Sequence, residues 1–421
     1  MQPKILSLFA SDQSIFLLAN IVFSASTYIV MLFIPYMLTM ESMAEFSSVY
    51  NAMLLLLGIF EFGIPISFLR FYQLYKITFL INAILQLTIV SGLILIAFSP
   101  FGNVLIEAFH LGQSQMSALL FFIAVITQLS WSFSRNILLT EQKYTFILIL
   151  SLFIFILRTV SLGYLYYHIE ILSINSILLS MFIIPFIPIF YVMLLNIART
   201  VNSYSIIKNY RRTKKIFFFY LKGFMKFSLM TFAIGVLYVF SGRYLIIYLT
   251  EQHQISLLAD LGYAMTFLGI ITIASASFRT FFISKFHLGD KKSITIHLDN
   301  YIGQIRLLVS FSILIAVLLS ITVYIIMPSY LSINAPIFVF ILTASYGVIF
   351  LLSLITFLSP TMNYNVLEIT INAARLIIIV VITRFIFLKN PIFGFLLINL
   401  VLMIGELIFA KILLKRLRYA H

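Results

Sequence analysis

The sequence predicts an all-α membrane protein that crosses the bilayer many times. Of its 421 residues, 62% are hydrophobic and 10% are charged, and a water-soluble fold of this length could not bury so much apolar surface. A membrane-spanning helix needs ~20 mostly apolar residues, and twelve such runs leave only short loops between them. A soluble domain on a membrane anchor is therefore excluded. So is a β-barrel, whose strands would alternate polar and apolar residues.

The twelve predicted helices are apolar runs bounded by polar or turn residues. They cover residues 14–38, 48–70, 77–98, 117–139, 144–167, 172–196, 224–249, 261–283, 305–327, 335–358, 365–388 and 392–414. The first run is long enough to span the membrane and lacks a small-residue cleavage site, so we expect no cleavable signal peptide.

The distribution of charge predicts the orientation of the chain. With the helices counted in order, the even-numbered gaps and the two termini hold 21 of the 27 Lys and Arg residues. The odd-numbered gaps hold Lys389 as their only basic residue, together with a set of acidic residues: Glu41, Glu45, Glu107, Glu170, Glu251 and Asp260. Because Lys and Arg collect on the cytoplasmic side, we expect both termini to be cytoplasmic.

A basic stretch divides the chain into two halves. Residues Ala198 to Lys226 include eight Lys or Arg and no Asp or Glu. We predict an N-terminal six-helix lobe at residues 1–197, a basic cytoplasmic linker at 198–223 and a C-terminal six-helix lobe at 224–421. The linker could bind anionic lipid headgroups or an anionic substrate from the cytoplasm. Alternatively, its charge serves only to set the topology.

The two halves are predicted to be related as a parallel repeat. Halves with an even number of helices are related by a pseudo-twofold axis along the membrane normal. Superposing the end of the second helix on the end of the eighth places Arg70 on Arg279 and Lys76 on Lys285. Both matches fall at the same helix end in each half.

Arginines inside the predicted helices are the strongest functional candidates. Each costs about 2.5–3.5 kcal/mol to insert, so those that persist usually face a protein interior or a wet cavity. Counting 1.5 Å per residue, Arg375 lies near the middle of the membrane, with Arg158 and Arg243 somewhat toward the outer side. Arg384 lies near the outer boundary.

A second set of arginines lies close to the cytoplasmic boundary. Its members are Arg70, Arg135 and Arg279. They could line a substrate cavity, or their side chains could extend to the cytoplasmic headgroups.

Acidic residues are fewer inside the membrane: Glu61, Glu368 and Glu406. A cavity with an excess of arginine favours an anion, because the planar guanidinium binds phosphate oxygens through two hydrogen bonds. We therefore expect Arg158, Arg243 and Arg375 to face one cavity between the lobes, with Glu61 or Glu368 as their nearest carboxylates. The alternative is that these arginines form buried pairs with the three glutamates, which could also serve in ion coupling.

Helix-breaking residues mark three of the predicted helices. They are Gly63 and Pro65 in the second, Pro185 and Pro188 in the sixth, and Gly235 and Gly242 in the seventh. Proline removes a backbone hydrogen bond and bends a helix, which could serve alternating access. The alternative is that Gly and Pro are simply more frequent in membrane helices.

Several aromatic residues could line a sugar-binding surface or anchor the chain at the membrane interface. They are Tyr28, Tyr36, Tyr238, Tyr244, Tyr248 and Trp131.

The sequence offers little for catalysis. It contains no cysteine, which excludes disulfides, thiolate catalysis and cysteine-bound metals. Its six histidines are scattered, and it has neither a Walker sequence nor an HExxH motif. We expect no enzymatic activity, no cofactor and no metal. We also expect no nucleic acid as partner, because the net charge of +14 is accounted for by membrane topology.

Two stretches resemble a known superfamily of transporters. One is MESMAEFSSVYNAMLLLLGIFEFGIPISFLRFY, Met40 to Tyr72, and the other is the EQKY run at Glu141 to Tyr144, followed by Arg158. With its length and two six-helix lobes, the whole chain resembles the multidrug/oligosaccharidyl-lipid/polysaccharide exporter superfamily, and within it the O-antigen and capsule repeat-unit flippases. The first stretch departs from the family pattern, because Ala44-Glu45-Phe46-Ser47 lacks the usual glycine.

This resemblance implies a substrate, a location and partners. The substrate would be an undecaprenyl-pyrophosphate-linked oligosaccharide, moved without ATP from the inner to the outer leaflet of the bacterial cytoplasmic membrane. Its lipid tail would stay in the bilayer while the arginines bind the pyrophosphate. Membrane lipids, the polysaccharide polymerase and the chain-length machinery would be the partners.

Two other functions remain open. A multidrug-type cation antiporter of the same superfamily would place carboxylates in its cavity, whereas the interior predicted here is basic. An O-antigen polymerase or ligase, a membrane enzyme, would need catalytic Arg or His in a large outer loop. The longest predicted outer loop, residues 99–116, has no Lys or Arg.

Overall fold

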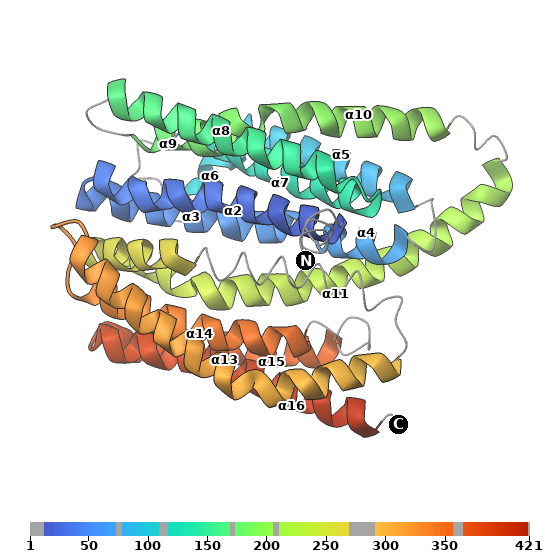
Figure 1. Ribbon diagram of the computed structural model, residues 1–421. Helices are drawn as coiled ribbons and strands as arrows, with labels where there is room; N and C mark the ends of the chain where they lie inside the picture. Colours follow the sequence, from blue (N-terminus) through green and yellow to red (C-terminus); the bar gives the residue numbers. More distant parts are fainter. Residues whose placement is uncertain are drawn as a thin grey trace, which may run out of the picture. The chain divides into compact units, whose positions relative to one another are not determined.

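The computed structural model describes residues 12–72, 78–108, 117–168, 173–204, 210–268, 291–356 and 365–419. All regular elements in these ranges are helical (Figure 1). Within the described ranges, ten helices are long and apolar enough to cross a membrane, and one bent pair counts as an eleventh if it forms a single span. The prediction of an all-α, multi-pass membrane protein is confirmed. The predicted eighth helix, residues 261–283, begins in the observed helix Ile255–Leu268 and continues outside the described residues.

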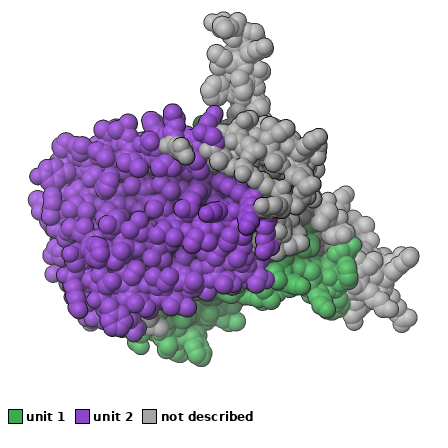
Figure 2. All heavy atoms as spheres, turned by 90° about the horizontal axis from the view of Figure 1, so that it is seen from below, with its two compact units in different colours: residues 1–26, 49–239 green, residues 27–48, 240–421 purple. Residues whose placement is uncertain are grey.

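The chain forms two compact units, coloured separately in Figure 2. Unit 1 comprises Met1–Ser26 and Val49–Val239, and unit 2 comprises Thr27–Ser48 and Phe240–His421. The divisions fall inside α2 (Asp12–Met37), α3 (Met40–Phe60) and α11 (Tyr210–Glu251). The domain limits expected at residues 197 and 223, and the pseudo-twofold relation, stay predictions.

Unit 1 is built around α7 (Ala118–Thr140). This helix contacts α5 (Thr78–Ala97), α8 (Tyr144–His168) and α10 (Ile187–Tyr204). Of the residues in its most apolar 18-residue stretch, 61% are buried. Trp131 of α7 stacks on Phe23, with ring centroids 4.9 Å apart, and is buried in a core cluster with Phe16 and Phe186. The expectation of Trp131 as a sugar-lining or interfacial residue is wrong, because its ring fills the core of unit 1.

The second predicted span is broken at a three-residue turn. Helix α3 ends at Phe60 and α4 (Ile64–Tyr72) begins after Gly63, with φ of 50° at Phe62 and 65° at Gly63. Glycine adopts positive φ without steric cost, and Pro65 suits the first turn of α4. A Cβ at Gly63 would also lie 2.4 Å from the carbonyl oxygen of Ser228 on α11. The predicted break at Gly63 and Pro65 is therefore confirmed, and it fits closely against α11.

The sixth predicted span is also irregular, as Pro185 led us to expect. It passes from α9 (Ile174–Leu178) through a π-helical turn, η1 (Leu179–Ile183), and a 3₁₀ turn, η2 (Ile184–Phe186), into α10. Proline has no amide hydrogen to donate to the preceding turn. Carbonyls in η1 are consequently available to side chains from neighbouring helices.

A third irregularity lies at the end of the third predicted span. There α5 and α6 (Pro100–Ala108) meet at an angle of 86°. The first part of the predicted outer loop at residues 99–116 is thus helical, with Pro100 at the helix start, where its missing amide hydrogen costs nothing.

Unit 2 contains α13 (Lys291–Ile326), α14 (Asn334–Thr356), α15 (Asn365–Ile382), the π-helical turn η4 (Thr383–Phe387) and α16 (Pro391–Tyr419). Helix α14 packs between α13 and α16, and 61% of the residues in its most apolar 18-residue stretch are buried. In the corresponding stretch of α13, only 11% of the residues are buried. The apolar surface of α13 is therefore available to lipid.

Helix α11 differs from the prediction in two ways. It runs from Tyr210 to Glu251, so it includes much of the basic stretch expected as a linker. It also continues through Gly235 and Gly242, so no helix break occurs there. Glycine retains its backbone hydrogen bonds in a helix, which keeps a membrane helix intact even where its propensity is low.

Candidate functional site

The most completely built polar cluster of unit 2 surrounds Arg375, in the middle of α15. Its Nη2 lies 3.0 Å from Glu406 Oε2 on α16, and both side chains are buried. Its Nη1 donates a 2.8 Å hydrogen bond to Asn372 Oδ1, one turn earlier on α15. The Thr356 hydroxyl at the end of α14 donates to the other carboxylate oxygen of Glu406. This cluster joins α14, α15 and α16.

The backbone of α16 is shaped to receive the guanidinium. A Cβ added to Gly405 would lie 2.0 Å from Arg375 Nε. Only glycine leaves this space, so the arginine lies directly against the helix backbone. The Nε atom itself is buried and has no hydrogen-bond partner among the residues that the structure describes. The guanidinium thus keeps one buried donor available.

A second arginine of unit 2, Arg243, lies on α11. The hydroxyl of Tyr346 on α14 lies 3.2 Å from the position of a Cβ at Gly242, the residue before Arg243 on α11. Arg243 Nη1 also contacts Met265 Sδ at 3.6 Å. This part of α11 therefore packs close to α14.

Arg158 occupies the core of unit 1 and is only 1% exposed. Its Nε donates to the carbonyl of Met181 in η1 at 2.9 Å, and its Nη1 donates to Ser26 Oγ at 2.8 Å. The guanidinium also lies over the rings of Phe23 and Phe186, 5.3 Å and 4.9 Å from their centroids. A guanidinium over an aromatic face is stabilised by the ring quadrupole.

Two side chains near Arg158 also donate hydrogen bonds to backbone carbonyls of η1. Thr127 of α7 donates to the carbonyl of Phe182, and Ser161 of α8 donates to that of Ser180 at 2.9 Å. Three consecutive carbonyls of η1 thus receive side-chain hydrogen bonds. These bonds compensate for the backbone bonds that the π turn disrupts.

Arg135 and Glu61 form a further polar site in unit 1. Arg135 donates to the side-chain oxygen of Asn20, and Ser132 donates a 2.6 Å hydrogen bond to Glu61 Oε1. The two charges attract each other. Glu61 lies in the turn between α3 and α4, so this site sits at the break in that span.

The remaining candidates are placed as follows. Arg384 is exposed and its Nε donates to the Tyr244 hydroxyl at 3.3 Å. Glu368 is half-buried in the first turn of α15. Arg70 lies on α4, and Arg279 lies outside the described residues. Among the described residues, no three His, Asp or Glu side chains converge as a metal site would require.

The structure therefore resolves one of the alternatives left open by the sequence. Arg375 forms a buried pair, and its carboxylate partner is Glu406, not the expected Glu61 or Glu368. Arg158 belongs to unit 1, whereas Arg243 and Arg375 belong to unit 2. That the three arginines face one cavity stays a prediction.

Other parts of these sites were not anticipated. Asn372 could have been found from its spacing, since it lies three residues before Arg375 and so on the same helix face. Thr356, Gly405 and Ser26 carry no comparable signal, because their roles depend on which helices pack together.

Comparisons with known proteins identify the fold. Neither family models nor curated proteins match the sequence. Among solved structures, the MATE multidrug transporter DinF-BH, determined in complex with a ligand, aligns over 96% of this chain and 94% of its own, with a TM-score of 0.62 and 12% identity. The eukaryotic MATE transporter AtDTX14 aligns over 97% of both chains, with a TM-score of 0.54 and 11% identity.

A bacterial example agrees. The Vibrio cholerae MATE transporter VcmN in its bent form aligns over 97% of this chain and 96% of its own, with a TM-score of 0.52 and 13% identity. The chain thus has the fold of these MATE transporters.

Proposed function

We propose that this protein is a flippase for an undecaprenyl-pyrophosphate-linked oligosaccharide, an O-antigen or capsule repeat unit. It moves this substrate from the inner to the outer leaflet of the bacterial cytoplasmic membrane, by the alternating access that a transporter fold allows. The observation that supports this proposal is the excess of arginine over glutamate in the interior of the spans, among the described residues. Arg158, Arg243 and Arg375 lie at least seven residues from either end of their spans, whereas Glu406 is the single glutamate that does so.

The Arg375 cluster suggests how an anion is received. A pyrophosphate presents oxygens to the guanidinium fork, as the Glu406 carboxylate does in this structure. We propose that the substrate takes the place of Glu406 and that Glu406 returns to Arg375 when the substrate leaves. Such an exchange avoids leaving a buried arginine without an anionic partner, which is costly in a membrane.

The membrane potential favours export of the substrate. With the inside negative, each negative charge moved outward gains ~2.3 kcal/mol per 100 mV. The proposal therefore requires neither ATP nor an obligatory coupling ion. The protein would work beside the polysaccharide polymerase and the chain-length machinery, which act on the translocated unit.

Complementation of a strain lacking this gene tests the proposal. Arg375→Ala should abolish surface polysaccharide and Arg375→Lys should restore it in part, because lysine keeps the charge but not the fork. The precursor should accumulate in the inner leaflet at single repeat-unit length. A precursor that reaches the outer leaflet unpolymerised would instead identify the protein as part of the polymerisation step.

A double variant distinguishes the loss of the Arg375 charge from a failure of the protein to fold. Arg375→Gln combined with Glu406→Gln removes both charges and keeps polar side chains that can bond to each other. If this protein accumulates normally in the membrane and still fails to export, the charge of Arg375 is required for transport. If it exports as well as the wild type, the anion-binding role of Arg375 is refuted. Arg384→Ala serves as a control at an exposed arginine.

Cation antiport is the second candidate. It is favoured by the carboxylates of Glu61, in the turn between α3 and α4, and Glu406, in α16, and by the multidrug transporter among the similar structures. In cells without their own efflux pumps, an antiporter should export a lipophilic cationic dye, and Glu406→Gln should abolish that export. Export of the dye together with normal surface polysaccharide in the deletion strain would favour this candidate over the flippase.

A further inference from the structure

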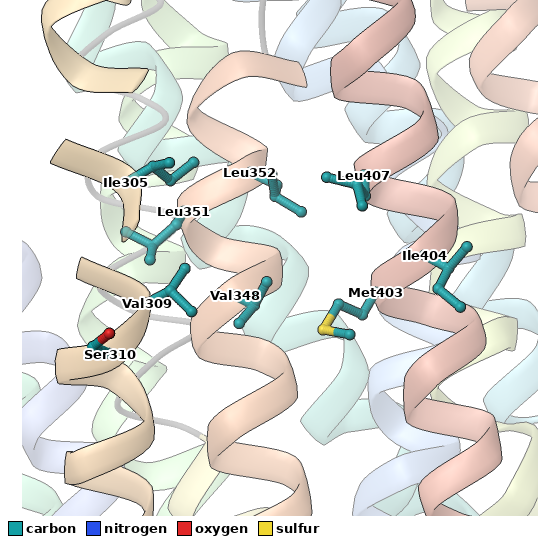
Figure 3. A pocket seen from close by; sticks show the side chains of 9 residues that line it. All are labelled: Ile305, Val309, Ser310, Val348, Leu351, Leu352, Met403, Ile404 and Leu407. Atoms are coloured by element: carbon teal, nitrogen blue, oxygen red, sulfur yellow. The ribbon is translucent and has the colours of Figure 1, made fainter. Parts of the chain in front are cut away.

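Three helices of unit 2 enclose an apolar groove (Figure 3). Its volume is about 440 Å³. The lining comes from α13, α14 and α16, and among the described residues Ser310 is its only polar member: Ile305, Val309, Ser310, Val348, Leu351, Leu352, Met403, Ile404 and Leu407. The groove is therefore suited to a hydrocarbon chain.

The groove lies on a surface that faces lipid. One wall of the groove is formed by α13, in which only 11% of the residues of the most apolar stretch are buried. Two of its residues on α16, Ile404 and Leu407, are about half exposed, at 48% and 53%. A membrane protein covers such apolar surface with lipid chains, so the groove is accessible from the bilayer.

The groove occupies one leaflet. Ile305 lies at the start of the apolar span of α13, which begins at Gly303, and Leu352 lies at the end of the span of α14, which ends at Ser353. These ends belong to the side that the charge distribution predicts to be cytoplasmic. The groove therefore opens to the inner leaflet in the predicted topology.

Two lysines extend the groove toward the membrane surface. Lys411 and Lys415 of α16 are exposed. Lys411 follows Leu407 by four residues and Ile404 by seven, and Lys415 follows Lys411 by four, so all four share one helix face. Lys411 lies about 6 Å beyond Leu407 along the helix axis, and Lys415 about 12 Å beyond it. An apolar groove thus leads to two positive charges at headgroup depth.

We propose that this groove binds an anionic phospholipid of the inner leaflet, with one acyl chain between α13, α14 and α16 and its phosphate at Lys411 and Lys415. Basic sites between membrane helices on the cytoplasmic side bind anionic headgroups. The site is independent of the proposed substrate. It lies next to the Arg375 cluster, since Thr356 follows Leu352 by one turn and Glu406 directly precedes Leu407.

Native mass spectrometry of the full-length protein tests this site. The purified protein is exposed to phosphatidylglycerol or to phosphatidylethanolamine with the same acyl chains, and the retained lipid is counted. We expect preferential retention of phosphatidylglycerol. Lys411→Gln with Lys415→Gln should reduce it about 25-fold, since each lysine near a membrane surface contributes about fivefold.

A second variant tests the groove itself. Ser310→Phe places a ring in the groove and should reduce phosphatidylglycerol retention, whereas Leu307→Phe, at a position 73% exposed and outside the groove, should not. Should Ser310→Phe fail to fold, the smaller Ser310→Leu should change retention in the same direction. Combining Ser310→Phe with the lysine changes should add little further loss, because both act on one lipid.

Several outcomes would overturn the proposal. One is equal retention of the two phospholipids. Another is an equal loss in Lys222→Gln with Lys226→Gln, a lysine pair of the same spacing on α11, which would show that general positive charge is responsible. A third is retention of polyprenyl phosphate in preference to phosphatidylglycerol, which would assign the groove to the transported lipid.

Discussion

Arg375 and Glu406 form a buried ion pair that joins α15 to α16, with 3.0 Å between Nη2 and Oε2 and side-chain exposures of 5% and 8%. Ionised groups are costly inside a membrane unless they are paired and hydrogen-bonded. Here the pair also receives hydrogen-bonding support from Asn372 and Thr356. The pair therefore has a structural role in unit 2 as well as the role proposed in transport.

The first prediction concerns the stability of this pair. Arg375→Met leaves the Glu406 carboxylate buried without its cation and should destabilise the protein by about 3–5 kcal/mol. Adding Glu406→Gln should recover part of the loss, because a neutral amide is cheaper to bury than a carboxylate. Thermal unfolding of the detergent-purified protein measures both effects. A double variant less stable than Arg375→Met would contradict this account.

The second prediction concerns Arg158 and the π-helical turn η1. Arg158→Lys keeps the charge but cannot reach both the Met181 carbonyl and Ser26 Oγ. We expect a loss of about 1–3 kcal/mol for the buried acceptor left without a donor, and faster amide hydrogen exchange around residues 179–186. Ser26→Ala removes one of the two bonds and should cost less. Unchanged exchange in Arg158→Lys would show that the guanidinium does not stabilise the turn.

Much of the fold could be predicted from the sequence because the bilayer imposes helix length and apolarity. The breaks at Gly63 and Pro185 were also predictable, since positive φ and a missing amide hydrogen are local properties. The continuity of α11 through Gly235 and Gly242 was not. Glycine lowers helix propensity, but surroundings without water preserve the hydrogen bonds of the helix.

The candidate site was predictable only in part. The sequence identifies Arg375 and Glu406 separately, because each is a charged residue inside an apolar run. Their pairing depends on how α15 packs on α16, and on the absence of a side chain at Gly405. Trp131 shows the same limit, because an amphipathic ring suits an interface or a core equally well until its neighbours are known.

The third prediction compares two glycines. Gly63→Ala places a Cβ 2.4 Å from the Ser228 carbonyl oxygen at a φ of 65°, and this strained position should make the protein less stable. Gly163→Ala in α8 has no atom within 4 Å of the new Cβ and should stabilise the helix by about 0.5–1 kcal/mol. The two changes add the same methyl group and should shift Tm in opposite directions. A neutral Gly63→Ala would mean that the turn between α3 and α4 can relax away from α11.

The last prediction concerns topology and follows from the basic residues in alternate gaps. The chain has no cysteine, so each introduced cysteine is the only thiol in the protein. Cysteines at Ser42, Ser114 and Gln252 should react with an impermeant maleimide in intact cells, whereas one at Ser205 should react only after the membrane is permeabilised. Labelling of all four in permeabilised cells is the control for accessibility. Labelling at Ser205 in intact cells would reverse the orientation. It would then place the Lys411 and Lys415 end of the groove in the outer leaflet, where an anionic phospholipid of the inner leaflet could not bind to it.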